Sequence, residues 1–482
     1  MPGQRDSLKR RRYDAVVVSS GPNGLAAGVT LARAGRSVVV IEAKPTFGGG
    51  ARTAELTLPG FRHDVCSAVH PTGVGSPFFN TLPLAEHGLE WVHPAVPLAH
   101  PLDDGSAAQL ARSFDETAAS LHGDGDAWRA LMEPFSRRCE ALFRDALAPL
   151  GIPRRPDLLA RFGLSAIRPA TALARSRFKG EHARALFAGI AAHVTRPLDH
   201  LLTGAVGLML GIAGHAVGWP VAQGGSSAII EALLAHLRGL GGEAIADWPV
   251  TDLGELPPAR AYFFDVAPVN LARIAERHLP RRYRDTLGKF RHGPGSFKLD
   301  WALSGPIPWK AAECHAAGTV HLGGTLDEIA FAEAEVCAGR HAERPYVLVA
   351  QQSLFDPTRA PEGKHTGWAY CHVPHGSDVD MTGAIESQVE RFAPGFRDLI
   401  IARSVMAPTK FSDYNANYVG GDIGAGVMDL WQTFTRPAAR LIPYTTPNSR
   451  IFLCSASTPP GPGVHGMCGY HAARAALRGV LR

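Results

Sequence analysis

The chain has 482 residues, of which 45% are hydrophobic and 19% are charged, and its formal net charge is +5. This length exceeds what one hydrophobic core supports, so about two domains are expected, and the composition excludes an intrinsically disordered chain. Part of the positive charge lies at residues 9–12, but no aromatic residues are interleaved with it, so nucleic-acid binding is not expected.

A βαβ pattern opens the chain. The β-branched run at residues 13–18 predicts a strand buried on both faces, and a glycine-containing turn and a helix follow at residues 19–32. Residues 37–41 predict a second strand, which ends at Glu42. Strand, turn, helix, strand and acid within about 30 residues are typical of a dinucleotide-binding unit.

Each position of this turn has a physical role. Gly21 lets the backbone approach a pyrophosphate, Gly24 lets the helix pack close to the strand, and the helix N-terminus stabilises negative charge. Glu42 is predicted to accept hydrogen bonds from an adenosine ribose. Ser19 stands where the pattern has its first glycine, and a side chain there costs roughly 1–2 kcal/mol if the turn needs an unusual φ. Weakened rather than abolished nucleotide binding is therefore expected.

A second glycine-rich segment, FGGGART, occupies residues 47–53. It resembles the glycine pair and arginine of the amine-oxidase-type and phytoene-desaturase-like flavoproteins, as do residues 58–64 and 67–71. The resemblance implies that this segment passes the pyrophosphate of FAD, with Arg52 as a charged donor. A glycine-rich hairpin is the alternative.

Residues 201–218 are almost free of charge. Eighteen such residues approach the lower limit for a membrane span, but five glycines and His215 argue against one. A buried helix is the plain interpretation. The wall of an apolar substrate tunnel, or a surface that contacts a membrane peripherally, are the alternatives.

The middle of the chain returns to strand and helix patterns. Residues 219–226 open a predicted helix, and residues 241–245 predict a strand that leads to Val250; in the resembled family this part belongs to the FAD domain, which implies that the Val250 backbone touches adenine. Residues 261–266 predict a further buried strand. The predicted fold class is α/β, with a two-dinucleotide-binding, Rossmann-like FAD domain interleaved with an α+β substrate domain. The FAD-binding domain is expected to comprise residues 10–100, 219–290 and 440–482, and the substrate domain residues 101–218 and 291–439.

Residues 420–426 are rich in glycine but follow no buried strand, so a resident NAD(P)H is not expected. Tyr414, with Asn415, Asn417 and Tyr418, forms either the polar end of a substrate pocket or a surface loop. Asp300 lies in a strand-like run and faces either the cavity or the core.

Residues 450–454 predict another strand, which a loop and a helix follow. In the resembled family this unit lies against the isoalloxazine ring, where the helix N-terminus stabilises charge on reduction. Pro462 interrupts the usual three glycines and removes a backbone donor. His465 is either an acid–base residue or a structural loop histidine, and His70 is a further candidate.

The seven cysteines form neither C-x-x-C nor a zinc-ligand spacing. We therefore expect a cytoplasmic protein, possible membrane association being left open, without a redox disulfide or a metal site. The oligomeric state is open.

The motif and the resemblance together predict FAD as the cofactor and a small apolar molecule as the substrate. The leading hypothesis is an FAD-dependent dehydrogenase or desaturase that removes hydride from a C–H bond. Because of Ser19 and Pro462, a non-redox, isomerase-type enzyme and a binding protein with weakened or absent flavin binding stay open. The catalytic candidates are His465, Tyr414 and His70. The predicted cofactor-binding residues are Ser19, Gly21, Asn23, Gly24, Glu42, Gly49, Gly50, Arg52, Thr53, Val250, Gly463, Val464 and His465.

Overall fold

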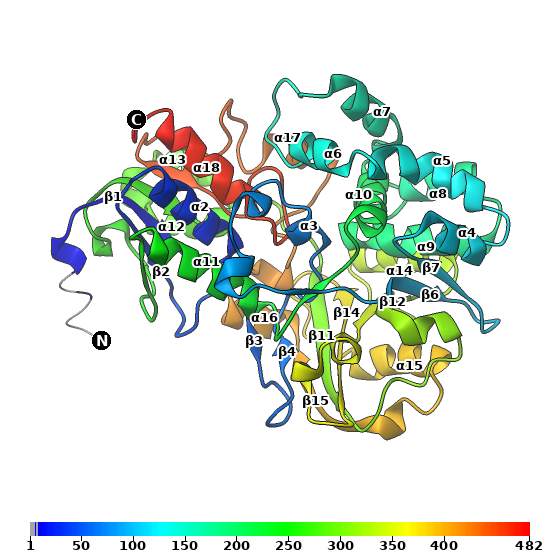
Figure 1. Ribbon diagram of the computed structural model, residues 1–482. Helices are drawn as coiled ribbons and strands as arrows, with labels where there is room; N and C mark the ends of the chain where they lie inside the picture. Colours follow the sequence, from blue (N-terminus) through cyan, green and yellow to red (C-terminus); the bar gives the residue numbers. More distant parts are fainter. Residues whose placement is uncertain (1–4, 6–7) are drawn as a thin grey trace.

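The computed structural model describes residue 5 and residues 8–482, and its first sheet consists of five parallel strands (Figure 1). In order across the sheet these are β16 (Ile451–Leu453), β10 (Ala259–Phe264), β1 (Tyr13–Val18), β2 (Val38–Ile41) and β9 (Glu243–Ile245). The strands come from three separate stretches of the chain. The sheet is therefore completed only when distant segments meet.

Helices cover both faces of this sheet. One face carries α2 (Pro22–Arg33), α11 (Ser227–Gly239) and α18 (Met467–Leu477), and the other carries α12 (Pro268–Ile274) and α13 (Arg281–Gly288). Alternate side chains along each strand enter different cores: Val17 and Val40 pack under the first set of helices, whereas Val16 and Val39 pack under the second. The nearly unbroken apolar runs in these strands follow from burial on both faces.

The second sheet has seven strands. In order these are β15 (Ile400–Met406), β11 (Gly295–Leu303), β14 (His365–Val373), β13 (Val347–Ala350), β12 (Ala317–Leu322), β6 (Val96–Pro101) and β7 (Ala107–Leu110). β6 pairs with β7 and lies parallel to β12. Residues 96–100 thus belong to the second sheet, although the sequence analysis grouped them with the first FAD-binding piece.

Short elements connect the two sheets. These are β3 (Thr53–Ala54), β4 (His63–Asp64), α3 (Pro71–Val74), β5 (Trp91–Val92) and β8 (Val221–Ala222). Further helices flank the second sheet or follow it, namely α14 (Leu326–Cys337), α15 (Thr382–Phe392), α16 (Pro408–Tyr414) and α17 (Leu430–Thr435). The predicted domain boundaries stay a prediction.

A layer of helices lies at the upper right of Figure 1. It comprises α4 (Phe114–Ser120), α5 (Gly125–Ser136), α6 (Cys139–Ala146), α7 (Pro156–Ala166), α8 (Ala170–Arg177), α9 (Glu181–Ala191) and α10 (Thr203–Ala216). α10 confirms the helix expected within residues 201–218, and its glycines allow close packing: a Cβ on Gly207 would lie 2.8 Å from the Phe187 ring. Within the described residues, no helix is both long and apolar enough to cross a bilayer.

A buried ion-pair network joins several of the short connecting elements. The Arg359 guanidinium, which is fully buried, donates to Asp64 of β4 (2.9 Å), to Asp356 (2.7 Å) and to the Ala222 carbonyl of β8 (3.1 Å). Although burial alone would raise it, the Arg359 charge holds the pKa of Asp64 below its usual range. Asp64 also accepts from the Ser226 N–H at the start of α11 (2.7 Å). Through its own bonds and those of Asp64, one arginine thereby ties β4, β8 and the start of α11 together.

Replacing this arginine tests the network. Arg359→Ala leaves two buried carboxylates without their cation, and we expect the free energy of unfolding to fall by about 3–5 kcal/mol. Arg340→Ala, which removes an exposed pair with Glu335, is the matched control and should leave stability nearly unchanged. Urea unfolding of both variants makes the comparison, and equal effects would contradict the role given to Arg359.

Candidate functional site

The N-terminus of α2 faces the carboxyl ends of β1 and β10, which is where parallel α/β sheets bind ligands. Asp265, directly after β10, accepts a hydrogen bond from the Gly24 N–H (2.9 Å). Gly24 itself is required by close packing, because a Cβ there would lie 2.1 Å from the Ser19 carbonyl oxygen. A Cβ on Gly21 would lie 2.8 Å from the Asp265 carboxylate. The turn is therefore built around glycine at these two positions.

Ser19 adopts the left-handed backbone conformation. Its φ is +84°, and its N–H donates to the Ile41 carbonyl (2.7 Å), which holds the residue in this geometry. A side chain in this region is strained by roughly 1–2 kcal/mol. The turn thus has the unusual φ at Ser19 that makes a side chain there unfavourable.

Asp265 is a site residue that sequence reasoning missed. Burial, opposed by the Gly24 N–H and reinforced by the charge of Glu42, raises the pKa of Asp265 to about 7. When protonated, this side chain places no charge at the helix N-terminus; when ionised, it repels an anion there. The signal that could have found it is an acidic residue directly after a buried apolar strand.

Glu42 and Arg52 contact each other. Glu42 Oε2 accepts from the Ser20 N–H (2.9 Å) and hydroxyl (2.6 Å), and Oε1 accepts from the Lys44 N–H and Arg52 (3.1 Å each). Arg52 also donates to the carbonyls of Thr46 and Gly49. A carboxylate accepts about four hydrogen bonds, so Glu42 is fully used by the chain itself. Its role toward a ribose stays a prediction.

Residues 414–418 lie against the glycine loop. The Tyr414 hydroxyl donates to the Gly49 carbonyl (2.7 Å), and the Tyr418 hydroxyl packs against Gly50. Asn417 accepts from the Ala267 N–H (2.8 Å) and donates to the Asp265 carbonyl (3.1 Å). This cover segment, residues 414–418, therefore spans the carboxyl edge from the glycine loop to β10. Burial raises the pKa of Tyr414 to about 12, so its hydroxyl stays protonated.

Both candidate histidines are buried and neutral. His465 Nδ1 accepts from the Met467 N–H (3.0 Å), and burial lowers the pKa of His465 to about 4. His70 Nε2 lies 2.9 Å from the Ser226 hydroxyl, and burial lowers the pKa of His70 to about 4 as well. Neither side chain carries a proton to donate as an imidazolium at neutral pH. Their catalytic roles stay predictions.

The remaining predicted cofactor-binding residues make contacts within the chain. The Thr53 hydroxyl donates to Asp64 (3.0 Å) and accepts from the Ser227 N–H (3.1 Å), which is a structural position. Val250 packs on the core under α12 and α13. A Cβ on Gly463 would lie 3.1 Å from the Thr72 hydroxyl, and the Val464 carbonyl lies close to Gly73, so this loop is packed against α3.

Several buried polar atoms near α2 and the β16–α18 loop have no hydrogen-bond partner among the described residues. They are Asn23 Oδ1, Arg436 Nη1, Ser455 Oγ, Ser457 Oγ and His465 Nε2. Buried polar groups are normally paired, because an unpaired one carries a desolvation cost. A ligand rich in polar atoms, such as FAD, therefore fits at this end of the site. At the opposite end, near Glu42, the chain already satisfies its own groups.

A charged cluster on β11 lies beyond the glycine loop. Lys298 forms a buried ion pair with Asp300, and His63 Nδ1 lies 3.5 Å from the same carboxylate. Burial, opposed by Lys298, raises the pKa of Asp300 to about 6, and burial lowers the pKa of His63 to about 3. Sequence reasoning singled out Asp300 but missed Lys298 and His63. The signal was two charges spaced by two residues, which places both on one face of a strand.

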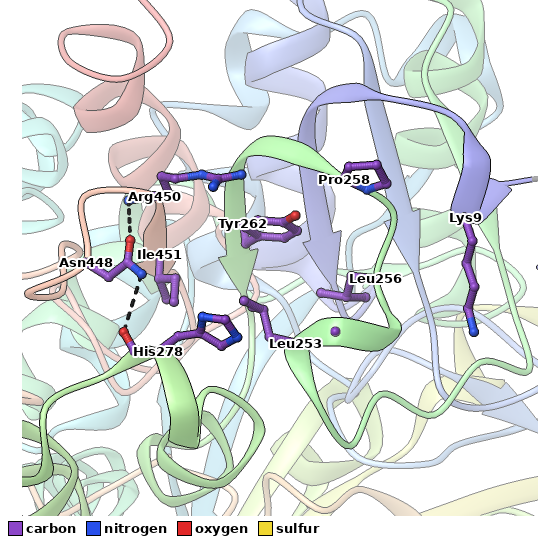
Figure 2. A pocket seen from close by; sticks show the side chains of 10 residues that line it. Lys9, Leu253, Leu256, Pro258, Tyr262, His278, Asn448, Arg450 and Ile451 are labelled. Carbon is purple, nitrogen blue, oxygen red and sulfur yellow. Dashed lines mark hydrogen bonds between the residues drawn. The ribbon is translucent and has the colours of Figure 1, made fainter.

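A cavity of about 450 Å³ lies at the amino ends of β10 and β16, as Figure 2 shows. Tyr262, Arg450, Asn448 and His278 line it, with Asn448 donating to the His278 carbonyl (3.3 Å). This is the edge opposite the N-terminus of α2. The cavity is therefore separate from the candidate cofactor site.

Comparisons with known proteins agree with this geometry. Residues 17–82 match the NAD(P)-binding Rossmann-like domain family. The chain is 25% identical to pyridine nucleotide-disulfide oxidoreductase domain-containing protein 2 of Rattus norvegicus, over 97% of this chain and 93% of that protein. It is also 25% identical to the neurosporene-forming phytoene desaturase of Cereibacter sphaeroides, over 94% of this chain and 92% of that protein. A solved structure of putrescine oxidase bound to putrescine has a TM-score of 0.61 at 17% identity, and the match covers 98% of this chain and 100% of that one.

The resemblance to phytoene-desaturase-like, amine-oxidase-type flavoproteins is therefore confirmed, and so is the predicted fold class. Over most of its length the chain is thus similar to an oxidoreductase domain-containing protein and to a phytoene desaturase.

The strain at Ser19 is testable. Because φ is +84°, we expect Ser19→Gly to unfold with a free energy about 1 kcal/mol higher than that of Ser19→Ala. The same pair at Ser176, on the exposed side of α8, should show the reverse order, since glycine is the poorer helix former. Urea denaturation measures all four variants. The same order at both positions would contradict a strained turn.

The buried carboxyl of Asp265 predicts a pH dependence. Its pKa is raised from an ordinary 3.8 to about 7, so the folded state holds the proton more tightly than the unfolded state. The wild-type protein should therefore lose stability relative to Asp265→Asn as pH rises from about 4 to about 7, with no further loss above that range. Urea unfolding at several pH values measures this difference, with Asp378→Asn as the exposed control. A difference that does not change with pH rules out an uncharged Asp265.

Proposed function

We propose that the protein binds FAD along the carboxyl ends of the first sheet and removes hydride from a C–H bond of a small apolar substrate. The observation that carries this proposal is the set of unpartnered buried polar atoms on α2 and the β16–α18 loop. A dinucleotide with many polar atoms is the kind of ligand that supplies their missing partners. FAD, when bound, supplies the hydride acceptor.

The chain itself contributes binding, exclusion of water and control of protons. The N-terminus of α2 offers backbone N–H groups to a pyrophosphate. The ion pair of Lys298 and Asp300, with His63 beside it, holds protons within the buried region next to the glycine loop. The similarity to a phytoene desaturase supports an apolar substrate.

Binding of FAD requires the cover segment to move. Tyr414 and Tyr418 lie against Gly49 and Gly50, where the family's cofactor passes. The alternative function, a binding protein that takes no flavin, is favoured by the complete use of Glu42 within the chain.

The visible absorbance spectrum of the purified protein, before and after addition of FAD, tests the proposal. We expect bound flavin in roughly stoichiometric amount, and bleaching without oxygen when an apolar substrate is oxidised. Flavin that binds but is never bleached would favour a non-redox enzyme. If no flavin binds even with excess FAD, the proposal is wrong and the alternative of a binding protein that takes no flavin remains.

A variant of the cover segment sharpens this test. Tyr414→Phe removes the hydrogen bond to Gly49 that holds the cover closed, so FAD should bind several-fold more tightly, the equivalent of about 1 kcal/mol. Tyr13→Phe removes a comparable bond to Glu243 at the other edge of the sheet and is the control. Flavin fluorescence titration gives both dissociation constants. An equal effect of the two variants would show that the cover does not compete with FAD.

A further inference from the structure

Arg436 is a buried cation without a carboxylate partner. Its side chain is almost completely enclosed, with 2% of the residue exposed, and it forms no ion pair with any described residue. Burial lowers the pKa of Arg436 to about 10, so the guanidinium keeps its charge at neutral pH. A buried charge that lacks an opposite charge is costly, which makes a purely structural role an incomplete explanation.

The existing contacts of Arg436 satisfy only part of its guanidinium. Nε donates to the Ser457 carbonyl (3.2 Å), and Nη2 donates to the carbonyls of Ala425 (2.7 Å) and Ala456 (3.0 Å). Nη1 has no partner. Carbonyl oxygens orient the guanidinium but do not neutralise it. Two of its five N–H groups therefore remain for an acceptor that also brings negative charge.

No acidic residue in the described part of the chain neutralises the Arg436 charge. The charge of Asp422 is close enough to act on the pKa of Arg436. However, the Asp422 carboxylate already accepts hydrogen bonds from the N–H groups of Gly293, Gly424 and Gly426 (2.8 Å each). It also lies 3.5 Å from His292. Asp422 is thus used to hold its own loop, and the Arg436 charge stays without a counterion.

The free Nη1 atom points toward the β16–α18 loop. A Cβ on Gly461 would lie 3.4 Å from it, and Gly461 has a φ of +113°. The hydroxyls of Ser455 and Ser457, which begin the same loop, also lack partners. One unpaired cation and two unpaired hydroxyls thus gather on the loop that follows the last strand of the first sheet.

We propose that Arg436 binds an anionic oxygen of the FAD, with Ser455 and Ser457 as neighbouring donors. This inference rests on the proposed function. The shared chemistry is a negatively charged oxygen, which comes either from the pyrophosphate or from the N1–C2=O edge of the reduced ring. The anionic oxygen accepts hydrogen bonds from the free N–H groups of Arg436 and neutralises its buried charge.

Binding measurements with three ligands test the proposal. FAD, ADP and inorganic pyrophosphate are titrated against the wild-type protein, Arg436→Gln and Arg440→Gln, the last an exposed arginine that serves as the control. We expect Arg436→Gln to weaken FAD binding by about 10- to 100-fold, and Arg440→Gln to leave it unchanged. If the oxygen belongs to the pyrophosphate, ADP and pyrophosphate binding fall as well. If it belongs to the ring, ADP binding is kept and the reduction potential of the bound flavin becomes more negative.

Arg436 also holds three carbonyls, so the glutamine variant is checked for folding by circular dichroism. Arg436→Lys keeps the buried cation and should bind FAD with intermediate affinity. The wild-type protein provides an independent measurement: pyrophosphate, ADP or FAD should raise its unfolding midpoint above that in sodium chloride of equal ionic strength.

The outcomes separate this inference from the proposed function. If the wild-type protein binds ADP or pyrophosphate through Arg436 but takes no FAD, the proposed function fails and the anion site stands. If FAD binds to wild type and Arg436→Gln with the same affinity and potential, the anion site is wrong and the flavoprotein stands. Absence of stabilisation by all three ligands overturns both.

Discussion

Burial of polar groups at the carboxyl edge of the first sheet is the constraint on which the candidate site depends. Five parallel strands end there, and four of them lead into buried polar residues, namely Ser20, Glu42, Asp265 and Ser455. Each such group needs a partner from the chain or from a ligand. The contacts along this edge therefore divide its polar groups into those that the chain pairs itself and those that a ligand can pair.

The two halves of the edge meet this requirement differently. Near β2 the chain is self-sufficient, because Glu42 is surrounded by donors. In the middle of the edge, Asp265 after β10 takes the Gly24 N–H that a phosphate would otherwise use. Near β16 the chain is incomplete, since Arg436 Nη1 and the hydroxyls of Ser455 and Ser457 lack partners within the described part of the chain. To bind at the β2 half, a ligand must first break hydrogen bonds within the chain. At the β16 half it forms hydrogen bonds with groups that have no partner. A cofactor is expected to gain most of its binding energy from the second half.

The sequence predicted those parts of the fold whose signal is local. The strand at residues 13–18, the helix after it and the strand predicted at residues 450–454 have their pattern within a few residues, and all appear in the structure, the last as β16. Contacts between distant residues were out of reach: Gly24 and Asp265 are 241 residues apart, and Tyr414 and Gly49 are 365 apart. The polar residues around position 414 were noticed, but no pattern indicates that they cover the glycine loop. Two local signals were present beside these: Lys298 alternates with Asp300 in an apolar strand, and Asp265 directly follows a buried strand.

The interleaved order of the first sheet has a consequence for synthesis. β1, α2 and β2 leave the ribosome early, but β10 follows only after the helices α4–α10, and α18, which packs on α2, is made later still. The apolar faces of the early unit therefore stay uncovered while the helical layer, whose contacts are local, is able to fold first. During translation the newborn N-terminal segment is the part of this molecule most exposed to aggregation, and the part for which a chaperone has the most to offer.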